Sequence, residues 1–96
     1  MKPSIAVQEK RAEIRAAASR FRTANPRVFG SVLHGNDVEG SDLDLLVEAL
    51  PGTTLFDLGG LQVELEQLLG VPVGVVTAGD LPSKFRDQVL AEARPI

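Results

Sequence analysis

The stretch "FGSVLHGNDVEGSDLDLLVE", residues 29–48, decides the fold, because it joins a glycine-rich polar loop to an alternating strand. In its second half, Leu43 and Leu45 alternate with acidic residues and are expected to face a core. Asp42 and Asp44 then share the opposite face, ~7 Å apart along the strand. Two like charges this close repel each other, so the group that compensates them is the key to the function.

A divalent cation is one such group. Two carboxylates on one face offer the hard oxygen ligands that Mg²⁺ prefers, together with water and substrate phosphates. Gly30 and Ser31 lie just upstream, where a glycine lets the backbone approach a ligand closely. The Ser31 hydroxyl and neighbouring amides can hold a phosphate if Ser31 opens a helical turn. Metal and phosphate in one site favour phosphoryl or nucleotidyl transfer.

Simpler interpretations stand beside this one. Asp42 and Asp44 can form a solvated strand face, and Gly30 can be an ordinary turn glycine. A calcium loop fits poorly, because the acidic pair runs into leucines and no further ligands follow. Among the other polar residues, we interpret His34 as solvent-facing, Glu48 as a solvated strand end and Asp80 as a helix cap.

The remaining chain predicts one α+β domain spanning residues 1–96, a small mixed β-sheet backed by helices in the order α-β-β-α-β-α. Hydrophobic periodicity and breaker residues predict three helices, over residues 4–21, 54–69 and 80–93. They predict three strands, over residues 27–30, 41–48 and 71–77, and a loop over residues 31–40 that has room for a helical turn.

Local signals refine the helices. Thr54 is the expected N-cap of the second helix, which ends at Gly70 and carries a leucine stripe. The pair Gly59–Gly60 weakens this helix by roughly 1 kcal/mol per glycine. In the first helix the expected core face is Ile14, Ala17, Ala18 and Phe21. In the last helix it is Phe85, Val89 and Ala93, with Asp80 or Ser83 as the cap.

Composition excludes several classes of protein. The 96 residues include no cysteine, which rules out disulfides and thiolate metal sites and fits a cytoplasmic location. The net charge of −3 lacks the basic field of nucleic-acid binding, so no direct nucleic-acid contact is expected. No segment has the apolar length of a membrane span or a signal peptide. The core is thin, so a second copy or another partner would help to stabilise it.

The motif resembles a known family. Gly30-Ser31, ten intervening residues and Asp42-Leu43-Asp44 match the G-S-x₁₀-D-x-D signature of the DNA polymerase β-like nucleotidyltransferases. The sequence is most similar to the minimal nucleotidyltransferase (MNT) branch, whose stand-alone domains have about this length. Gly35, Ser41 and the order of elements agree with that branch along nearly the whole chain.

This resemblance implies a palm-like mixed sheet that carries the carboxylates. It implies that Asp42 and Asp44 are catalytic and bind two Mg²⁺ ions around the triphosphate of ATP, and that Gly30 and Ser31 contact the phosphates. MNT proteins are often antitoxins of HEPN-domain ribonuclease toxins, and some transfer AMP from ATP onto the toxin. The implied function is therefore protein adenylylation with a HEPN toxin as partner.

Two departures from the family pattern favour a second hypothesis. The family carries a third carboxylate on the next strand, and Gly74 occupies that position here. His34 stands where an arginine is common. If the third carboxylate acts as the general base of the family, its loss costs about 10²–10⁴-fold in rate. AMP transfer by this chain is therefore expected to be impaired. The alternative is a catalytically weak or inactive binding module that neutralises its partner by contact. Transfer to a small molecule is a third hypothesis, which the short chain disfavours.

Overall fold

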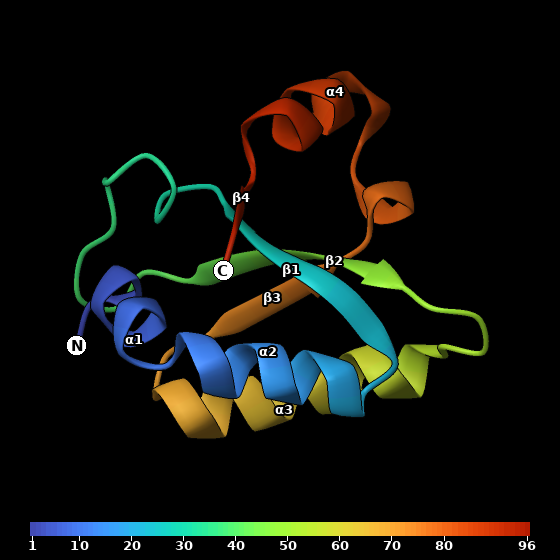
Figure 1. Ribbon diagram of the computed structural model, residues 1–96. Coiled ribbons are helices and arrows are strands. Elements are labelled where there is room, and N and C mark those ends of the chain that lie inside the picture. Colours follow the sequence, from blue (N-terminus) through green and yellow to red (C-terminus); the bar gives the residue numbers. More distant parts are fainter.

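The computed structural model describes residues 1–96 as one α+β domain with a four-stranded sheet (Figure 1). The predicted fold class is therefore confirmed. No helix is both long enough and apolar enough to cross a bilayer. The elements are, in chain order, α1 (Pro3–Glu9), α2 (Arg11–Arg20), β1 (Thr23–Phe29), β2 (Leu43–Ala49), α3 (Leu55–Leu69), β3 (Val73–Val76), the 3₁₀ turn η1 (Ala78–Asp80), α4 (Ser83–Glu92) and β4 (Arg94–Pro95).

The sheet is mixed, with strand order β3-β2-β1-β4. β1 pairs antiparallel with both β2 and β4, whereas β2 pairs parallel with β3. A parallel pair needs a crossover connection, and α3 provides it between β2 and β3. This topology puts β2 in the middle of the sheet, with a neighbouring strand on each side.

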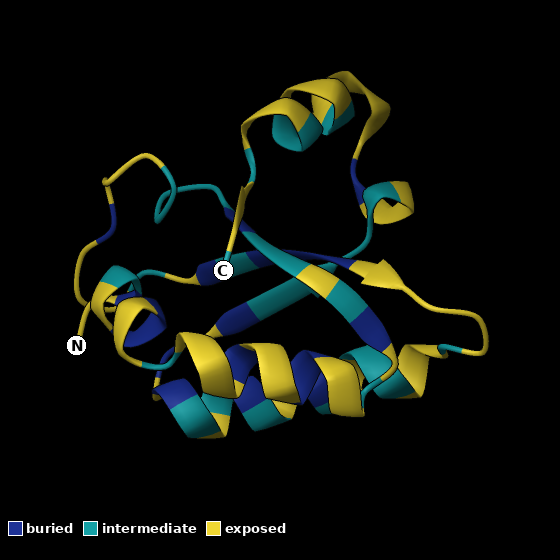
Figure 2. Ribbon diagram, viewed as in Figure 1, coloured by how far each residue is buried: buried dark blue, intermediate teal, exposed yellow.

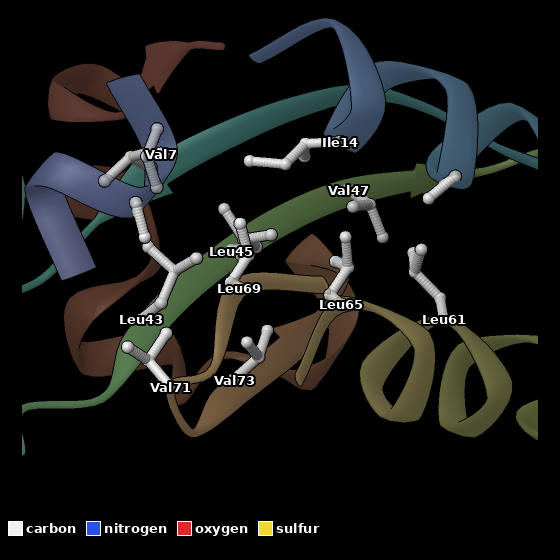
Figure 3. Packing of buried hydrophobic residues seen from close by; sticks show 13 residues of the cluster. Val7, Ile14, Leu43, Leu45, Val47, Leu61, Leu65, Leu69, Val71 and Val73 are labelled. Atoms are coloured by element: carbon white, nitrogen blue, oxygen red, sulfur yellow. The ribbon is translucent and has the colours of Figure 1, made fainter. Parts of the chain in front are cut away.

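The core lies between the sheet and the helices α1, α2 and α3, which all cover the same face. Figure 3 shows Leu43, Leu45 and Val47 of β2 pointing into this layer, where Leu65 and Ile14 meet them from α3 and α2. All five side chains are 1% exposed or less, so the predicted alternation of β2 is confirmed. Burying such a side chain contributes about 1.5–3 kcal/mol.

The opposite face of the sheet is far less covered. Only η1 and α4 rise over it, and no residue of α4 is buried (Figure 2). The prediction that Phe85, Val89 and Ala93 face the core is therefore wrong, and Phe85 is 50% exposed. The three helices earlier in the chain already fill the core face, so α4 follows β3 to the other side.

The predicted first helix, residues 4–21, is in fact two helices. The chain leaves helical geometry at Lys10, with φ −122° and ψ 23°. In a straight helix, Lys10 would continue the buried stripe that contains Val7 and Ile14 and would point its ammonium group at the core. The bend keeps Val7 and Ile14 buried and leaves the lysine partly exposed.

Strand boundaries also differ from the prediction. β1 begins at Thr23 rather than Arg27, because Asn25 and Pro26 form a register shift inside the strand instead of preceding it. Asn25 has φ 50° there, and a bulge tolerates a proline that cannot donate to the ladder. The strand β4 was not predicted at all, since its two residues are too few to show alternation.

The second helix follows the prediction closely. Thr54 caps α3 in a capping box with Asp57, and the helix ends at Gly70. Gly60 has a packing role that the sequence did not indicate. A Cβ atom at this position would lie 2.6 Å from the ring of Phe21, whereas a Cβ at Gly59 would meet nothing within 4 Å.

These two glycines predict opposite effects of alanine. Gly59→Ala is expected to raise the free energy of unfolding by about 0.5–1 kcal/mol, since it adds helix propensity without a contact. In Gly60→Ala the Phe21 ring must move, so the gain is expected to be cancelled or reversed. Urea denaturation of both variants measures the difference, and equal stabilisation of the two would contradict the packing of Phe21 on α3.

Candidate active site

Asp44 lies at the centre of the less covered face of the sheet. Its neighbours on β2 face the core, and its partners across the strands are Phe29 on β1 and Gly74 on β3. Cross-strand partners share a face, so any side chain at position 74 would stand next to Asp44. The carboxylate is half-buried, and it makes no hydrogen bond or ion pair within the chain.

The backbone of Gly30 lies directly against this carboxylate. Gly30 follows the last residue of β1, with φ 75°, a conformation that L side chains rarely adopt. A Cβ atom at Gly30 would overlap Oδ2 of Asp44. The sequence predicted that this glycine allows a close approach of backbone to a ligand. The structure adds that it allows the close approach of backbone to Asp44.

The loop expected after β1 contains a hydrogen-bonded turn over residues 30–35, and no helix forms there. The amide of His34 donates to the carbonyl of Gly30 at 3.3 Å, and the amide of Asn36 donates to the carbonyl of Ser31 at 2.9 Å. The Ser31 hydroxyl makes no hydrogen bond within the chain and is partly exposed. The turn therefore has a free hydroxyl on the residue that follows the glycine against Asp44, which is a suitable arrangement for a phosphate.

Asp42 supplies the second carboxylate. It lies one residue before β2 begins, and it is exposed and without an ion pair. Partial burial, and then the nearby negative charge of Asp42, raise the pKa of Asp44 above its usual range. Both causes disfavour the ionised form of Asp44. A cation placed between the two carboxylates would remove this penalty.

No third carboxylate completes the group. A Cβ atom at Gly74 would lie 3.6 Å from Oδ1 of Asp44, so the position is adjacent but carries no ligand. Nowhere in the chain do three metal-binding side chains gather. The prediction that Asp80 or Ser83 caps the last helix is wrong, because the N-cap of α4 is Pro82, which provides no side-chain cap. Asp80 instead accepts hydrogen bonds from Thr77 in the capping box of η1.

The other residues weighed at the sequence level take local partners. Glu48 accepts a hydrogen bond from Asn25 at 2.6 Å and so is no ligand here. His34 is about half exposed, and its Nε2 lies 3.3 Å from a carboxylate oxygen of Glu92 on α4. This contact ties the turn after β1 to the helix above the open face.

Asp37 is a residue that the sequence did not indicate. It is 6% exposed, and its carboxylate accepts a hydrogen bond from the amide of Ser4 at 2.9 Å. This hydrogen bond lowers the pKa of Asp37. It also satisfies a backbone amide at the N-terminus of α1, where Lys2 provides no side-chain cap. The two residues are 33 positions apart, so no local motif could reveal the contact.

The shape of the site is open. The cavities of the molecule lie elsewhere, and none is lined by Gly30, Ser31, Asp42 or Asp44. Small-molecule substrates are usually held in concave pockets. The exposed Asp42 and the half-buried Asp44 instead lie on an open surface that a large molecule can reach.

Comparison with known proteins identifies the family. Residues 11–96 match the model of the nucleotidyltransferase domain. A protein of Methanocaldococcus jannaschii assigned as a protein adenylyltransferase is 41% identical over 66 residues, which are 69% of this chain and 71% of that protein. The protein adenylyltransferase MntA of Thermococcus cleftensis is 37% identical over 76% of this chain and 74% of its own length. The chain therefore belongs to the nucleotidyltransferase domain family.

Solved structures agree with this assignment. A structure described as a minimal nucleotidyltransferase superposes with a TM-score of 0.86 and 41% identity, covering 97% of this chain and 95% of that one. The predicted resemblance to minimal nucleotidyltransferases is thereby confirmed. A toxin–antitoxin structure with AMP-PNP has the same fold, with a TM-score of 0.73 at 20% identity over 88% of this chain and 69% of that one.

The contact between Gly30 and Asp44 predicts a large effect of Gly30→Ala. The new Cβ both strains the backbone and displaces the carboxylate, so we expect a loss of more than about 2 kcal/mol in the free energy of unfolding. Gly35→Ala is the matched control, because Gly35 has φ 71° but open space around it, and only the strain of about 1–2 kcal/mol applies. Equal losses in the two variants, measured by urea denaturation, would contradict the contact.

The raised pKa of Asp44 predicts how stability changes with pH. The folded state holds this proton more tightly than the unfolded state, so ionisation of Asp44 costs stability as the pH rises through the carboxyl range. Asp44→Asn is therefore expected to stabilise the protein at pH 7 and to lose that advantage below the ordinary aspartate range. Thermal unfolding between pH 3 and pH 7 tests this, with Asp87→Asn on exposed α4 as the control.

Proposed function

We propose that this chain is a Mg²⁺-dependent nucleotidyltransferase that transfers AMP from ATP to a hydroxyl group on a protein. The observation that carries the proposal is the position of Asp44, held between Gly30 and Gly74 with Asp42 beside it and no cation of the chain within ion-pair distance. This arrangement leaves a negative site next to a phosphate-binding turn. A metal–nucleotide complex is a ligand that matches both parts.

The donor set fits Mg²⁺. Two aspartate carboxylates, with water and phosphate oxygens completing the shell, are a common way for proteins to bind this ion. Asp42 and Asp44 would hold it, and when bound it supplies positive charge against the triphosphate. With Gly74 in place of a third acid, the chain's own ligands suffice for the phosphate-side ion of the family's two-metal arrangement.

The residues of the chain then have distinct roles. Gly30 and Ser31 bind phosphate oxygens through backbone amides and the free hydroxyl. In the transfer step, a bond forms between the acceptor oxygen and the α-phosphorus of ATP, and the bond to the β-phosphate oxygen breaks. Pyrophosphate leaves, and the acceptor proton passes to solvent. No side chain at position 74 is available to accept that proton.

The open site supports a protein acceptor. Since no cavity adjoins Asp44, a small acceptor molecule would have no enclosed site, whereas a protein segment could lie across the exposed face. The named adenylyltransferase relatives and the toxin–antitoxin structures support a toxin as that partner. We propose that the partner is a HEPN-domain ribonuclease and that the chain acts as its antitoxin in the cytoplasm, where ATP is available.

The alternative proposal is neutralisation by contact alone. Gly74 favours it, because a site without the third acid is expected to transfer slowly. The two proposals differ in what Asp42→Asn does to protection of cells that express the toxin. Loss of protection supports transfer, whereas full protection supports a binding module with little catalysis.

Calorimetric titration with ATP tests the proposed site directly. Binding is expected to require Mg²⁺ and to weaken strongly in Asp42→Ala, because the site then offers the ion only one carboxylate. Asp87→Ala is the matched control and is expected to bind as the unaltered protein does. Absence of binding to the unaltered protein in the presence of Mg²⁺ would overturn the proposal and leave a domain that acts by contact.

The position of Gly74 beside Asp44 predicts how Gly74→Asp changes thermal stability and AMP transfer. The new Cβ fits at 3.6 Å from Asp44, but its carboxylate adds a third negative charge. Without metal, the variant is expected to unfold at a lower temperature than the isosteric Gly74→Asn. Saturating Mg²⁺ is expected to reverse this order and to raise AMP transfer. If Mg²⁺ changes the unfolding temperatures of both variants equally, position 74 does not belong to the metal site.

A further inference from the structure

A cavity lies behind the turn that follows β1, away from Asp42 and Asp44. It has a volume of about 250 Å³ and opens between α1, the turn and β4, which lie together at one end of β1 in Figure 1. The residues that matter for its chemistry are two arginines and four apolar side chains: Arg11, Arg94, Val7, Val28, Val32 and Leu33.

The two arginines carry uncompensated charge. Neither Arg11 nor Arg94 makes a hydrogen bond or an ion pair, although the chain has 13 acidic residues against 10 basic ones. Asp37 is close to one wall of the cavity through its bond to Ser4, but its carboxylate is buried and already occupied there. Both arginines are exposed and line the same cavity, so two free guanidinium groups are available there to a single anion.

The apolar residues that line the cavity indicate which kind of anion it can bind. Val7 and Val28 are almost fully buried, and Val32 and Leu33 pack against the same core. The apolar surface that remains for a ligand is therefore mainly that of Val32 and Leu33, which a hydrocarbon chain would cover and a bare inorganic anion would not. Guanidinium groups bind carboxylates in a two-pronged geometry. The volume lies just below the usual range of ligand pockets, so the cavity suits a short hydrocarbon chain rather than a long one.

We propose that this cavity binds a short-chain organic carboxylate, with Arg11 and Arg94 on the carboxylate and the chain against Val28 and Leu33. Neither the family assignment nor the acidic site accounts for these residues. The ligand would also contact the turn of residues 30–35 from behind, because Val32 and Leu33 belong to it. This step rests on the proposed function, in which the same turn binds the phosphates of ATP. The carboxylate and ATP would then alter each other's affinity.

In the test, hexanoate is titrated into the full chain without nucleotide, and binding is monitored by the NMR shifts of the backbone amides. Saturable shifts are expected at Val32 and Leu33. Arg11→Gln and Arg94→Gln are each expected to weaken binding by about tenfold or more, since each removes a charged hydrogen bond. Lys84→Gln, an exposed lysine on α4, is the matched control and is expected to change nothing. Hexanol lacks the charge and acetate lacks the chain, and both are expected to bind more weakly.

Two results would overturn the proposal. One is the absence of saturable shifts with hexanoate, and the other is equal affinity in the arginine variants and the control. A second arm measures ATP binding with and without saturating hexanoate, and an unchanged ATP affinity would overturn the coupling. The first arm needs no nucleotide, so failure of the proposed transferase function would leave its result unaffected.

Discussion

The close approach of the Gly30 backbone to the Asp44 carboxylate is the constraint on which the site depends. It joins the end of β1 to the start of β2, and any side chain at position 30 would displace the carboxylate. It also sets where the turn of residues 30–35 starts, and so where the Ser31 hydroxyl and the amides lie. The groups that we propose bind phosphate and metal thus come together through one backbone contact rather than through an enclosed pocket.

Charge explains why this arrangement needs a ligand. Asp42 and Asp44 stand without a cationic partner on a face that α1, α2 and α3 leave uncovered, and partial burial makes the ionised form of Asp44 costly. Arg11 and Arg94 stand without an anionic partner on the other side of the same turn. Uncompensated charges of both signs, on either side of one short turn, fit a domain whose active state includes bound ligands.

Much of this could be predicted from the sequence because the signals are local. The alternation in β2, the capping of α3 by Thr54 and the spacing from Gly30 to Asp44 each depend on neighbouring residues. The predictions that failed concern features that depend on contacts between residues far apart in the sequence. The bend at Lys10 and the solvent-facing side chain of Phe85 follow from which core positions other elements have already filled. The bond from Ser4 to Asp37 and the two-residue strand β4 left no periodic pattern.

The most direct test of this account is a carboxyl NMR titration of Asp44, with and without Mg²⁺ and a non-hydrolysable ATP analogue. The account predicts that the pKa of Asp44 lies above the usual aspartate range in the free protein and falls below it when metal and nucleotide bind. A pKa that stays raised after both are added would show that Asp44 does not hold the metal. That result would contradict the central claim that this face of the sheet is a metal–nucleotide site.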